Sequence, residues 1–268
     1  MLNKIFFVSY LHLHIIYCLI IVNLREMIVK ENFIMKNTKA TWTAHILTLF
    51  PEMFPGPINF SLVGKALKKK IWSLNLINIR DFSKKGPKDI DDKPYGGGSG
   101  MIIKSEVIDR ALKTTTKKIK DYSLIYLTPK GKKLNQKKIK QLTKKRNLVI
   151  LCGKYEGVDQ RVIDDWNMEE ISIGDFILSG GELASMCLLD SCVRMLPGVL
   201  GSSNSLKNET FENNLLEHPQ YTKPSNWKGM GVPEVLLTGN HKKIEEWKKK
   251  ESLKITKLKR PDLLRVKN

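Results

Sequence analysis

The chain has 268 residues, of which 46 are Lys or Arg and 27 are Asp or Glu, so its formal net charge is +19. Apolar residues at 41% and charged residues at 27% are typical of a folded globular protein and exclude a disordered or fibrous one. The positive charge indicates an anionic partner, for which nucleic acid is the first candidate and an anionic membrane surface the second. The alternative is that the excess of positive side chains only keeps the protein soluble.

The cysteines and histidines form no recognisable metal motif. The four cysteines contain no CxxC pair, which excludes a zinc ribbon and a thioredoxin-like motif, and the five histidines form no HExxH. Cys187 and Cys192 lie five residues apart in a segment with helical character, which favours buried thiols over a disulfide. We therefore expect a reducing, cytoplasmic setting and no metal ion held by protein ligands.

Residues 1–40 differ in composition from the rest of the chain. Ile5–Leu24 carries no charged residue and is long enough to span a bilayer, although polar side chains interrupt it. It lacks the small-residue cleavage site of a signal peptide. We interpret residues 1–40 as an extension that is disordered or precedes the true start, at Met27 or Met35, in preference to a signal anchor. No stable membrane partner is expected.

Strands and helices alternate over residues 41–200. The pattern of apolar residues predicts strands at Trp42–Phe50, Ile71–Ile79, Ser123–Leu127, Leu148–Cys152 and Glu170–Ile173. Helical spacing predicts helices at Ser61–Lys70, Ser105–Lys113, Leu134–Lys145, Val158–Trp166 and Glu182–Met195. Because Leu148–Cys152 is entirely apolar, we place it at the centre of a parallel sheet. This order predicts an α/β domain that binds ligands at the carboxyl ends of its strands.

A polar loop, a linker and a basic region complete the pattern. Asp81–Gly100 predicts a long polar loop. Residues 201–212, which begin Gly-Ser-Ser-Asn-Ser, predict a flexible interdomain linker. Ile244–Lys250 and Leu253–Leu264 have helical spacing with basic faces, so residues 213–268 are expected to form a small, mostly helical domain.

Glycine-bearing loops follow three of the predicted strands, at Thr128–Gly131, which is expected to be a turn, Gly153–Gly157 and Gly174–Gly181. Glycine lets the main chain approach a ligand closely, so these loops predict one site lined by backbone groups, with ordinary βα turns as the alternative. The P-loop motif is absent. Tyr95–Gly100 lies in a polar loop and not directly after a strand, which favours a substrate-contact loop over a Rossmann dinucleotide site.

Several segments closely resemble the bacterial tRNA (guanine-N1)-methyltransferase family. The resemblance runs from about residue 42 to residue 264. It rests on Leu49–Phe54, Pro94–Met101, Cys152–Asp159, Ser172–Glu182, Pro197–Gly201, His218–Pro224 and Val235–His241. It implies the SPOUT fold, a parallel α/β sheet with a C-terminal trefoil knot, followed by the small helical domain as a tRNA-binding domain. It also implies a homodimer with active sites between the subunits.

The resemblance further implies a reaction and its site. Family members transfer a methyl group from S-adenosylmethionine to N1 of the guanine immediately 3′ of the tRNA anticodon, assisted by magnesium without a dedicated protein cage. By resemblance, the cofactor-binding residues are Tyr126, Leu127, Pro129, Gly153, Tyr155, Glu156, Ile173, Gly174, Asp175, Phe176, Ile177, Leu178, Gly180 and Gly181. The residues expected to contact tRNA are Asp91, Tyr95, Gly98 and Lys154.

Two residues are expected to carry the chemistry. N1 of guanine bears a proton, so methyl transfer requires a general base, and the charge that develops on O6 requires a cation or hydrogen-bond donors. The family's aspartate base corresponds to Glu209, which keeps the carboxylate on a longer side chain, with Glu212 as the fallback. The family's catalytic arginine corresponds to Arg194. Lys154 is a second departure from the family pattern, because close relatives carry arginine at this position. Lysine keeps the positive charge but cannot form the paired hydrogen bonds of a guanidinium group.

Two basic segments are expected to contact tRNA phosphates. Lys130–Arg146 has nine cations and no acid, and Lys242–Arg260 has nine cations against three acids. Solvated helix faces are the alternative for either segment. Two other functions stay open: a non-catalytic RNA-binding protein, which would not bind S-adenosylmethionine, and a knotted methyltransferase that acts on another RNA base or on a ribose hydroxyl.

Overall fold

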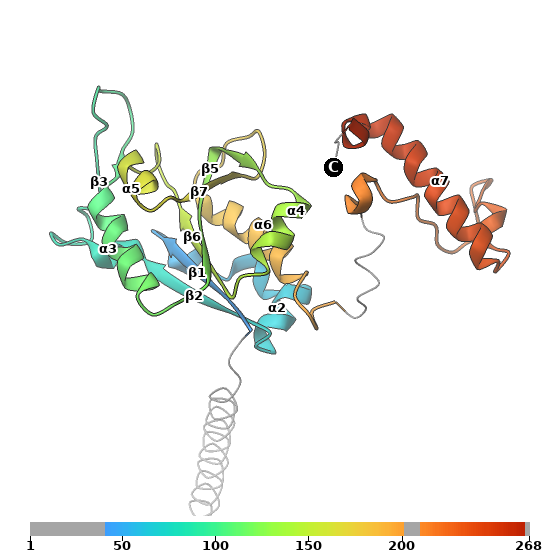
Figure 1. Cartoon of the computed structure of the whole chain (residues 1–268), viewed down its shortest axis with the longest axis horizontal. Helices are drawn as coiled ribbons and strands as arrows, with labels where there is room; N and C mark the ends of the chain where they lie inside the picture. The colour runs from blue at the N-terminus through green and yellow to red at the C-terminus, as the bar shows by residue number, and fades with distance from the viewer. Residues whose placement is uncertain (1–40, 201–209, 266–268) are drawn as a thin grey trace, which may run out of the picture.

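The computed structural model describes residues 41–200 and 210–265 (Figure 1). The predicted extension over residues 1–40, most of the predicted linker and Glu209 therefore lie outside the described residues. No helix within the two described ranges is both long and apolar enough to cross a membrane.

Five parallel strands form the central sheet. They are β1 (Trp42–Thr48), β2 (Trp72–Asn78), β5 (Tyr122–Lys133), β6 (Asn147–Cys152) and β7 (Glu169–Ser172). Their spatial order is β2-β1-β6-β5-β7, so β6, which contains the apolar run Leu148–Cys152, is the middle strand. The predicted α/β class and the central position of this strand are confirmed.

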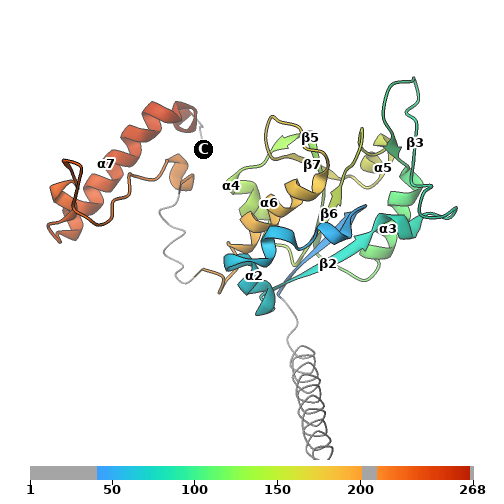
Figure 2. The same cartoon turned by 180° about the vertical axis from the view of Figure 1, so that it is seen from behind.

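Helices cover both faces of the sheet, giving three layers (Figures 1 and 2). On one face lie α2 (Ser61–Lys68), α4 (Gln136–Leu142) and α6 (Gly181–Val193). On the other face lie α3 (Ser105–Thr116) and α5 (Gln160–Asp165). All five were predicted, with ends that differ by a few residues.

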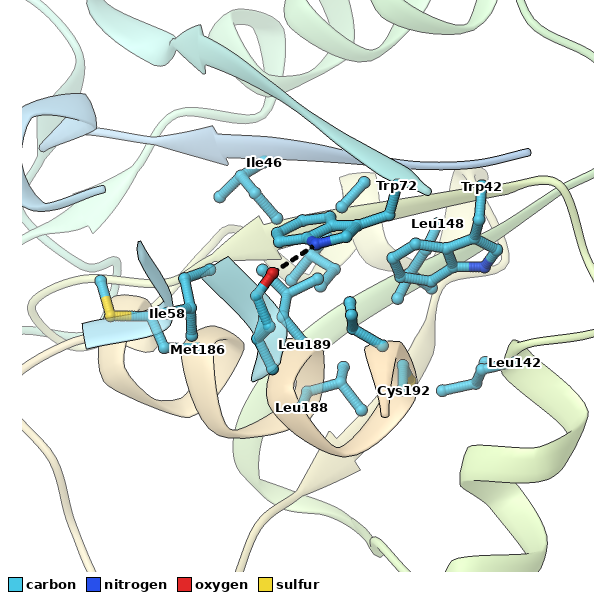
Figure 3. Packing of buried hydrophobic residues seen from close by; sticks show 14 of the residues in the cluster. Trp42, Ile46, Ile58, Trp72, Leu142, Leu148, Met186, Leu188, Leu189 and Cys192 are labelled. Carbon is cyan, nitrogen blue, oxygen red and sulfur yellow. Dashed lines mark hydrogen bonds between the residues drawn. The ribbon is translucent and has the colours of Figure 1, made fainter. Parts of the chain in front are cut away.

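The core beneath α6 consists of large apolar side chains from the sheet and the helices of that face (Figure 3). Trp72 is completely buried and donates a hydrogen bond from Nε1 to the carbonyl oxygen of Val63 at 3.0 Å. Leu188 and Leu189 of α6 are also completely buried. Burying a leucine contributes about 1.5–3 kcal/mol, so this packing fixes α6 against the sheet.

The predicted turn at Thr128–Gly131 is wrong, because this segment lies inside β5. Leu127 and Lys132 both pair with Ile171 of β7, and the residues between them form an irregularity in the register. A Cβ atom on Gly131 would lie 2.4 Å from the backbone nitrogen of Ile171. Glycine at position 131 therefore allows β5 to lie closer to the backbone of β7 than a residue with a side chain would permit.

The predicted polar loop at Asp81–Gly100 is partly ordered by strand pairing. Within it, β3 (Asp91–Asp92) pairs antiparallel with β4 (Ile102–Ile103). The ammonium of Lys104 lies 2.6 Å from a carboxylate oxygen of Asp89 and closes the base of this hairpin.

Only one of the two cysteines that were expected to be buried is buried. Cys192 is buried, and burial raises its thiol pKa to about 12. Cys187, which was also expected to be buried, is exposed. Five residues turn an α-helix through about 500°, so the two side chains point about 140° apart around α6 and cannot both face the sheet.

Residues 210–265 contain a long helix and a short hairpin. The predicted helical segment Ile244–Lys250 lies within α7 (His241–Lys259). The second predicted segment, Leu253–Leu264, begins in α7 and ends in the 3-10 helix η7 (Pro261–Arg265). The antiparallel hairpin of β8 (Asn226–Trp227) and β9 (Met230–Gly231) was not predicted.

Candidate functional site

A cavity of about 350 Å³ lies at the carboxyl ends of β5, β6 and β7. Its walls consist of residues 126–130, 153–158, 170–174 and 176–181, together with Gln160, Ile163 and Ala184. The glycine-bearing loops after β6 and β7 thus meet around one space, as predicted, and the third side of that space is a segment of β5 itself, Tyr126–Lys130.

Thirteen of the fourteen residues expected to bind a cofactor line this cavity. The exception is Asp175, whose carboxylate forms an ion pair with Lys133. Lys154, expected to contact tRNA, also lines the cavity, whereas Asp91, Tyr95 and Gly98 do not. The roles of these residues stay predictions.

Glycines allow the loops after β6 and β7 to touch. The backbone N–H of Gly181 donates to the carbonyl oxygen of Gly153 at 2.8 Å. A Cβ atom on Gly181 would lie 2.8 Å from the Cα atom of Cys152, and one on Gly153 would lie 2.9 Å from the Tyr126 hydroxyl. This part of the cavity wall is therefore main chain, held in place by contacts that leave no room for side chains.

Glu182, which the sequence analysis did not single out, connects β1 to these loops. Its side chain is 2% exposed, and Oε1 accepts a hydrogen bond from the Thr48 hydroxyl at 2.7 Å. The same hydroxyl accepts from the backbone N–H of Phe50 at 2.9 Å. A Cβ atom on Gly180 would lie 2.5 Å from Oε2, so the carboxylate sits directly behind the cavity wall. The sequence signal that could have pointed to Glu182 is an acid in the first turn of a mostly apolar helix.

The cavity combines a buried phenol with carboxylates. Burial raises the pKa of Tyr126, and the nearby charge of Glu170 raises it further, so the phenol is neutral at pH 7. The backbone of Val158 and the side chain of Thr128 are its hydrogen-bond partners. Two carboxylates, Glu156 and Glu170, and two ammonium groups, Lys130 and Lys154, line the cavity. Within residues 41–200 and 210–265, no three His, Cys, Asp or Glu side chains are grouped so as to hold a metal ion.

The Tyr95–Gly100 loop is joined directly to the cavity wall. The backbone N–H of Glu156 donates to the carbonyl oxygen of Met101 at 3.1 Å, at the end of this loop. A Cβ atom on Gly100 would lie 2.5 Å from Cγ of Glu156. Tyr95 is fully exposed. The loop therefore starts from the cavity and presents its glycines and its tyrosine to solvent.

Arg194 lies at the far end of α6 from the cavity. The helix begins at Gly181, which lines the cavity, and Arg194 follows its last residue. Thirteen residues at 1.5 Å each separate the two by about 20 Å. One chain therefore does not bring Arg194 to its own cavity.

The fold and the cavity define a parallel α/β protein with a cavity between the loops at the ends of its strands, and sequence comparison gives the family. The profile of the family described as "tRNA (Guanine-1)-methyltransferase TrmD" matches residues 43–266. The chain belongs to this tRNA (guanine-N1)-methyltransferase family, which confirms the resemblance.

Curated relatives agree with that assignment, and all three described here are named tRNA (guanine-N(1)-)-methyltransferase. The chain is 53% identical to that of Ehrlichia canis (strain Jake), over 83% of this chain and 95% of the relative. It is 52% identical to that of Wolbachia pipientis wMel, over 82% and 94%. It is 50% identical to that of Pelagibacter ubique (strain HTCC1062), over 83% and 96%.

Proposed function

We propose that the chain is an S-adenosylmethionine-dependent tRNA (guanine-N1)-methyltransferase that methylates N1 of the guanine immediately 3′ of the anticodon. The observation that carries this proposal is the cavity at the ends of β5, β6 and β7. It brings together thirteen of the fourteen residues that the family resemblance assigned to the cofactor. A non-catalytic RNA-binding protein would have no need of such a cavity.

The residues of the cavity suit S-adenosylmethionine, which supplies, when bound, a methyl group on a positively charged sulfur. Backbone groups around Gly153 and Gly181 can form hydrogen bonds to the edge of an adenine. The apolar side chains of Ile173 and Leu178 can cover its face. The carboxylates of Glu156 and Glu170 complement the positive charges of the ligand.

For the transfer itself, the chain must deprotonate and orient the guanine. We assign proton abstraction at N1 to the carboxylate of Glu209, with Glu212 as the fallback, and stabilisation of the charge on O6 to the guanidinium of Arg194. The remaining contribution is positioning, because N1 must lie in line with the methyl group. We propose that Asp91, Tyr95 and Gly98 help to position the tRNA next to Lys154.

A homodimer with sites between subunits is consistent with the geometry of one chain. Arg194 lies about 20 Å along α6 from Gly181, which lines the cavity of the same chain. Around the mouth of the cavity, Tyr155, Phe176 and Ile177 are 48%, 54% and 80% exposed. A cluster of large exposed apolar side chains is typical of an interaction surface. We propose that a second copy covers this surface and supplies Arg194 and Glu209 to the site.

The remaining predictions follow from the family. We assign the trefoil knot of the SPOUT fold to the part of the chain after β6, where the loop at Gly153 meets the loop at Gly181. We assign residues 213–268 to tRNA binding, with the basic helix α7 along the phosphates. Magnesium would assist methyl transfer without a dedicated set of protein ligands. We place the reaction in the cytoplasm.

Single-turnover methyl transfer to tRNA tests the assignment of the base. Glu209→Gln is expected to lower the rate by at least about 100-fold, because a general base contributes 10²–10⁴-fold, and to leave S-adenosylmethionine affinity unchanged. Glu212→Gln is the matched control and is expected to retain the wild-type rate. Near-normal turnover by Glu209→Gln would overturn the assignment, and loss of activity in Glu212→Gln alone would transfer it to the fallback.

A further inference from the structure

The hairpin of β8 and β9 holds a tryptophan away from any core. Trp227 is 57% exposed and Met230, opposite it across the turn, is 59% exposed. By contrast, Trp42 and Trp72 are 2% and 0% exposed. A rigid surface tryptophan is typical of a binding site, because its large apolar ring gains most from being covered.

The hairpin is built to keep this ring in place. Its two turn residues, Lys228 and Gly229, have φ angles of 50° and 81°, and positive values at both positions are the signature of a tight hairpin turn. The side chain of Asn226 accepts a hydrogen bond from the backbone N–H of Gly229 at 3.0 Å. The backbone N–H of Val232 donates to the carbonyl oxygen of Ser225 at 2.9 Å and closes the base. The ring is therefore presented on an ordered turn.

The charge around the ring indicates what could cover it. The Lys228 ammonium lies 5.0 Å from the centroid of the Trp227 ring. Between Glu217 and Glu234 the sequence contains Lys223 and Lys228 but no further Asp or Glu. An aromatic face beside the Lys228 ammonium matches an unpaired nucleotide, whose base stacks on the ring and whose phosphate pairs with the lysine.

We propose that Trp227 and Lys228 form a stacking site for one unpaired base of the tRNA substrate. This inference rests on the proposed function and adds a contact that is separate from the cavity. Contact of this hairpin with its own copy on a two-fold axis is disfavoured, because it would bring two Lys228 ammonium groups together. The stacked base gives affinity without sequence readout, since every base has an aromatic face.

Binding of a tRNA transcript to the full-length protein tests the proposal. Trp227→Ala is expected to weaken tRNA binding by about 5- to 150-fold, the range that corresponds to one stacked base, and Trp227→Phe is expected to restore most of the affinity. Leu237→Ala is the matched control, because Leu237 is an exposed apolar residue of the same region at 63% exposure. It is expected to bind tRNA as the wild type does.

Two further readouts separate stacking from other causes. Stacking quenches indole fluorescence, so tRNA is expected to quench the wild type more than Trp227→Phe. The mass in solution is expected to be the same for all variants. Unchanged tRNA affinity in Trp227→Ala, or a loss of the dimer in that variant, would overturn the proposal. If the wild type itself bound no tRNA, the proposed function would fail first, so the two failures are distinguishable.

Discussion

His45 is a titratable side chain buried within the sheet. Its Nδ1 atom accepts a hydrogen bond from the side-chain amide of Asn75 at 3.1 Å. With that nitrogen occupied as an acceptor, Nε2 carries the proton and donates to the side-chain oxygen of Asn147 at 3.2 Å. Burial lowers the pKa of His45 below its usual value, because the charged form loses its hydration.

This histidine is expected to make stability depend on pH. Because its pKa in the folded chain lies below the unfolded value of 6.5, the unfolded chain binds the proton more readily. Its destabilising effect is absent above the unfolded pKa and grows as the pH falls through 6.5 towards the folded pKa. Urea unfolding at about pH 7.5 and about pH 5.5 should show this loss of stability, and His45→Gln should reduce it. His241→Gln, at an exposed position, is the control and should lose as much stability as the wild type. Equal losses in the wild type and His45→Gln would count against this role of His45.

Gly181 gives a prediction for the cavity wall. In Gly181→Ala the new methyl group would lie 2.8 Å from the Cα atom of Cys152, a backbone atom that cannot move aside. Overpacking of this kind costs about 1–3 kcal/mol and would separate the two cofactor loops. Calorimetry should show a large loss of S-adenosylmethionine affinity. Gly231→Ala, where a Cβ atom meets nothing within 4 Å, should bind the cofactor as the wild type does.

Single residues also show where sequence reasoning succeeds and where it fails. The cavity glycines could be predicted because glycine after a strand is a local signal. The side chains of Asp175 and Glu182 could not be placed, because their positions depend on Lys133 and Thr48, which are far away in the sequence. Local pattern carries no information on such partners.

Among the elements, the contact between β1 and α6 has the most direct consequence for the site. It depends on the buried hydrogen bond from Thr48 to Glu182, whose carboxylate lies behind the cavity wall. Removing the hydroxyl would leave a buried carboxylate oxygen without its donor.

Thr48→Val should therefore lower the free energy of unfolding by about 1–3 kcal/mol. It should also raise the KM for S-adenosylmethionine more than it changes kcat, because it disturbs the loops and not the reacting groups. Thr41→Val is the matched control, since its hydroxyl donates to the carbonyl oxygen of Ile71 at the surface and its loss should cost little. Denaturant unfolding and steady-state kinetics of both variants would check this, and equal effects would refute it.

Elements with strong periodicity were predictable and the others were not. The strand β6 contains the apolar run Leu148–Cys152, and α7 carries a helical repeat. The hairpin of β8 and β9 has strands of two residues, too short for any alternation of apolar and polar positions. The segment at Thr128–Gly131 reads as a turn, and only its pairing with β7 makes it part of a strand.

For the whole molecule, the net charge belongs to the part that matches the family. Residues 1–34 contain three cations and two acids, a net charge of +1, so the remaining 234 residues carry +18. The anionic partner predicted from composition is therefore assigned to the methyltransferase region, and we identify it with tRNA. Composition could predict an anion but not its kind, which required the family.

Mixed dimers test whether the sites lie between subunits. Gly181→Ala is expected to remove cofactor binding and Arg194→Ala removes the proposed catalytic arginine, so each variant alone should be inactive. If a site uses the cavity of one chain and Arg194 of the other, each mixed dimer holds one competent site, and an equal mixture should recover about a quarter of wild-type activity. If each site belonged to one chain, the mixture would remain inactive.

The most direct test of the central claim is methyl transfer from labelled S-adenosylmethionine to two tRNA transcripts, which differ only in whether guanine or another base follows the anticodon. The guanine transcript should accept one methyl group at N1, and the other transcript should accept none. Equal methylation of both transcripts, or no methylation of either, would contradict the assignment.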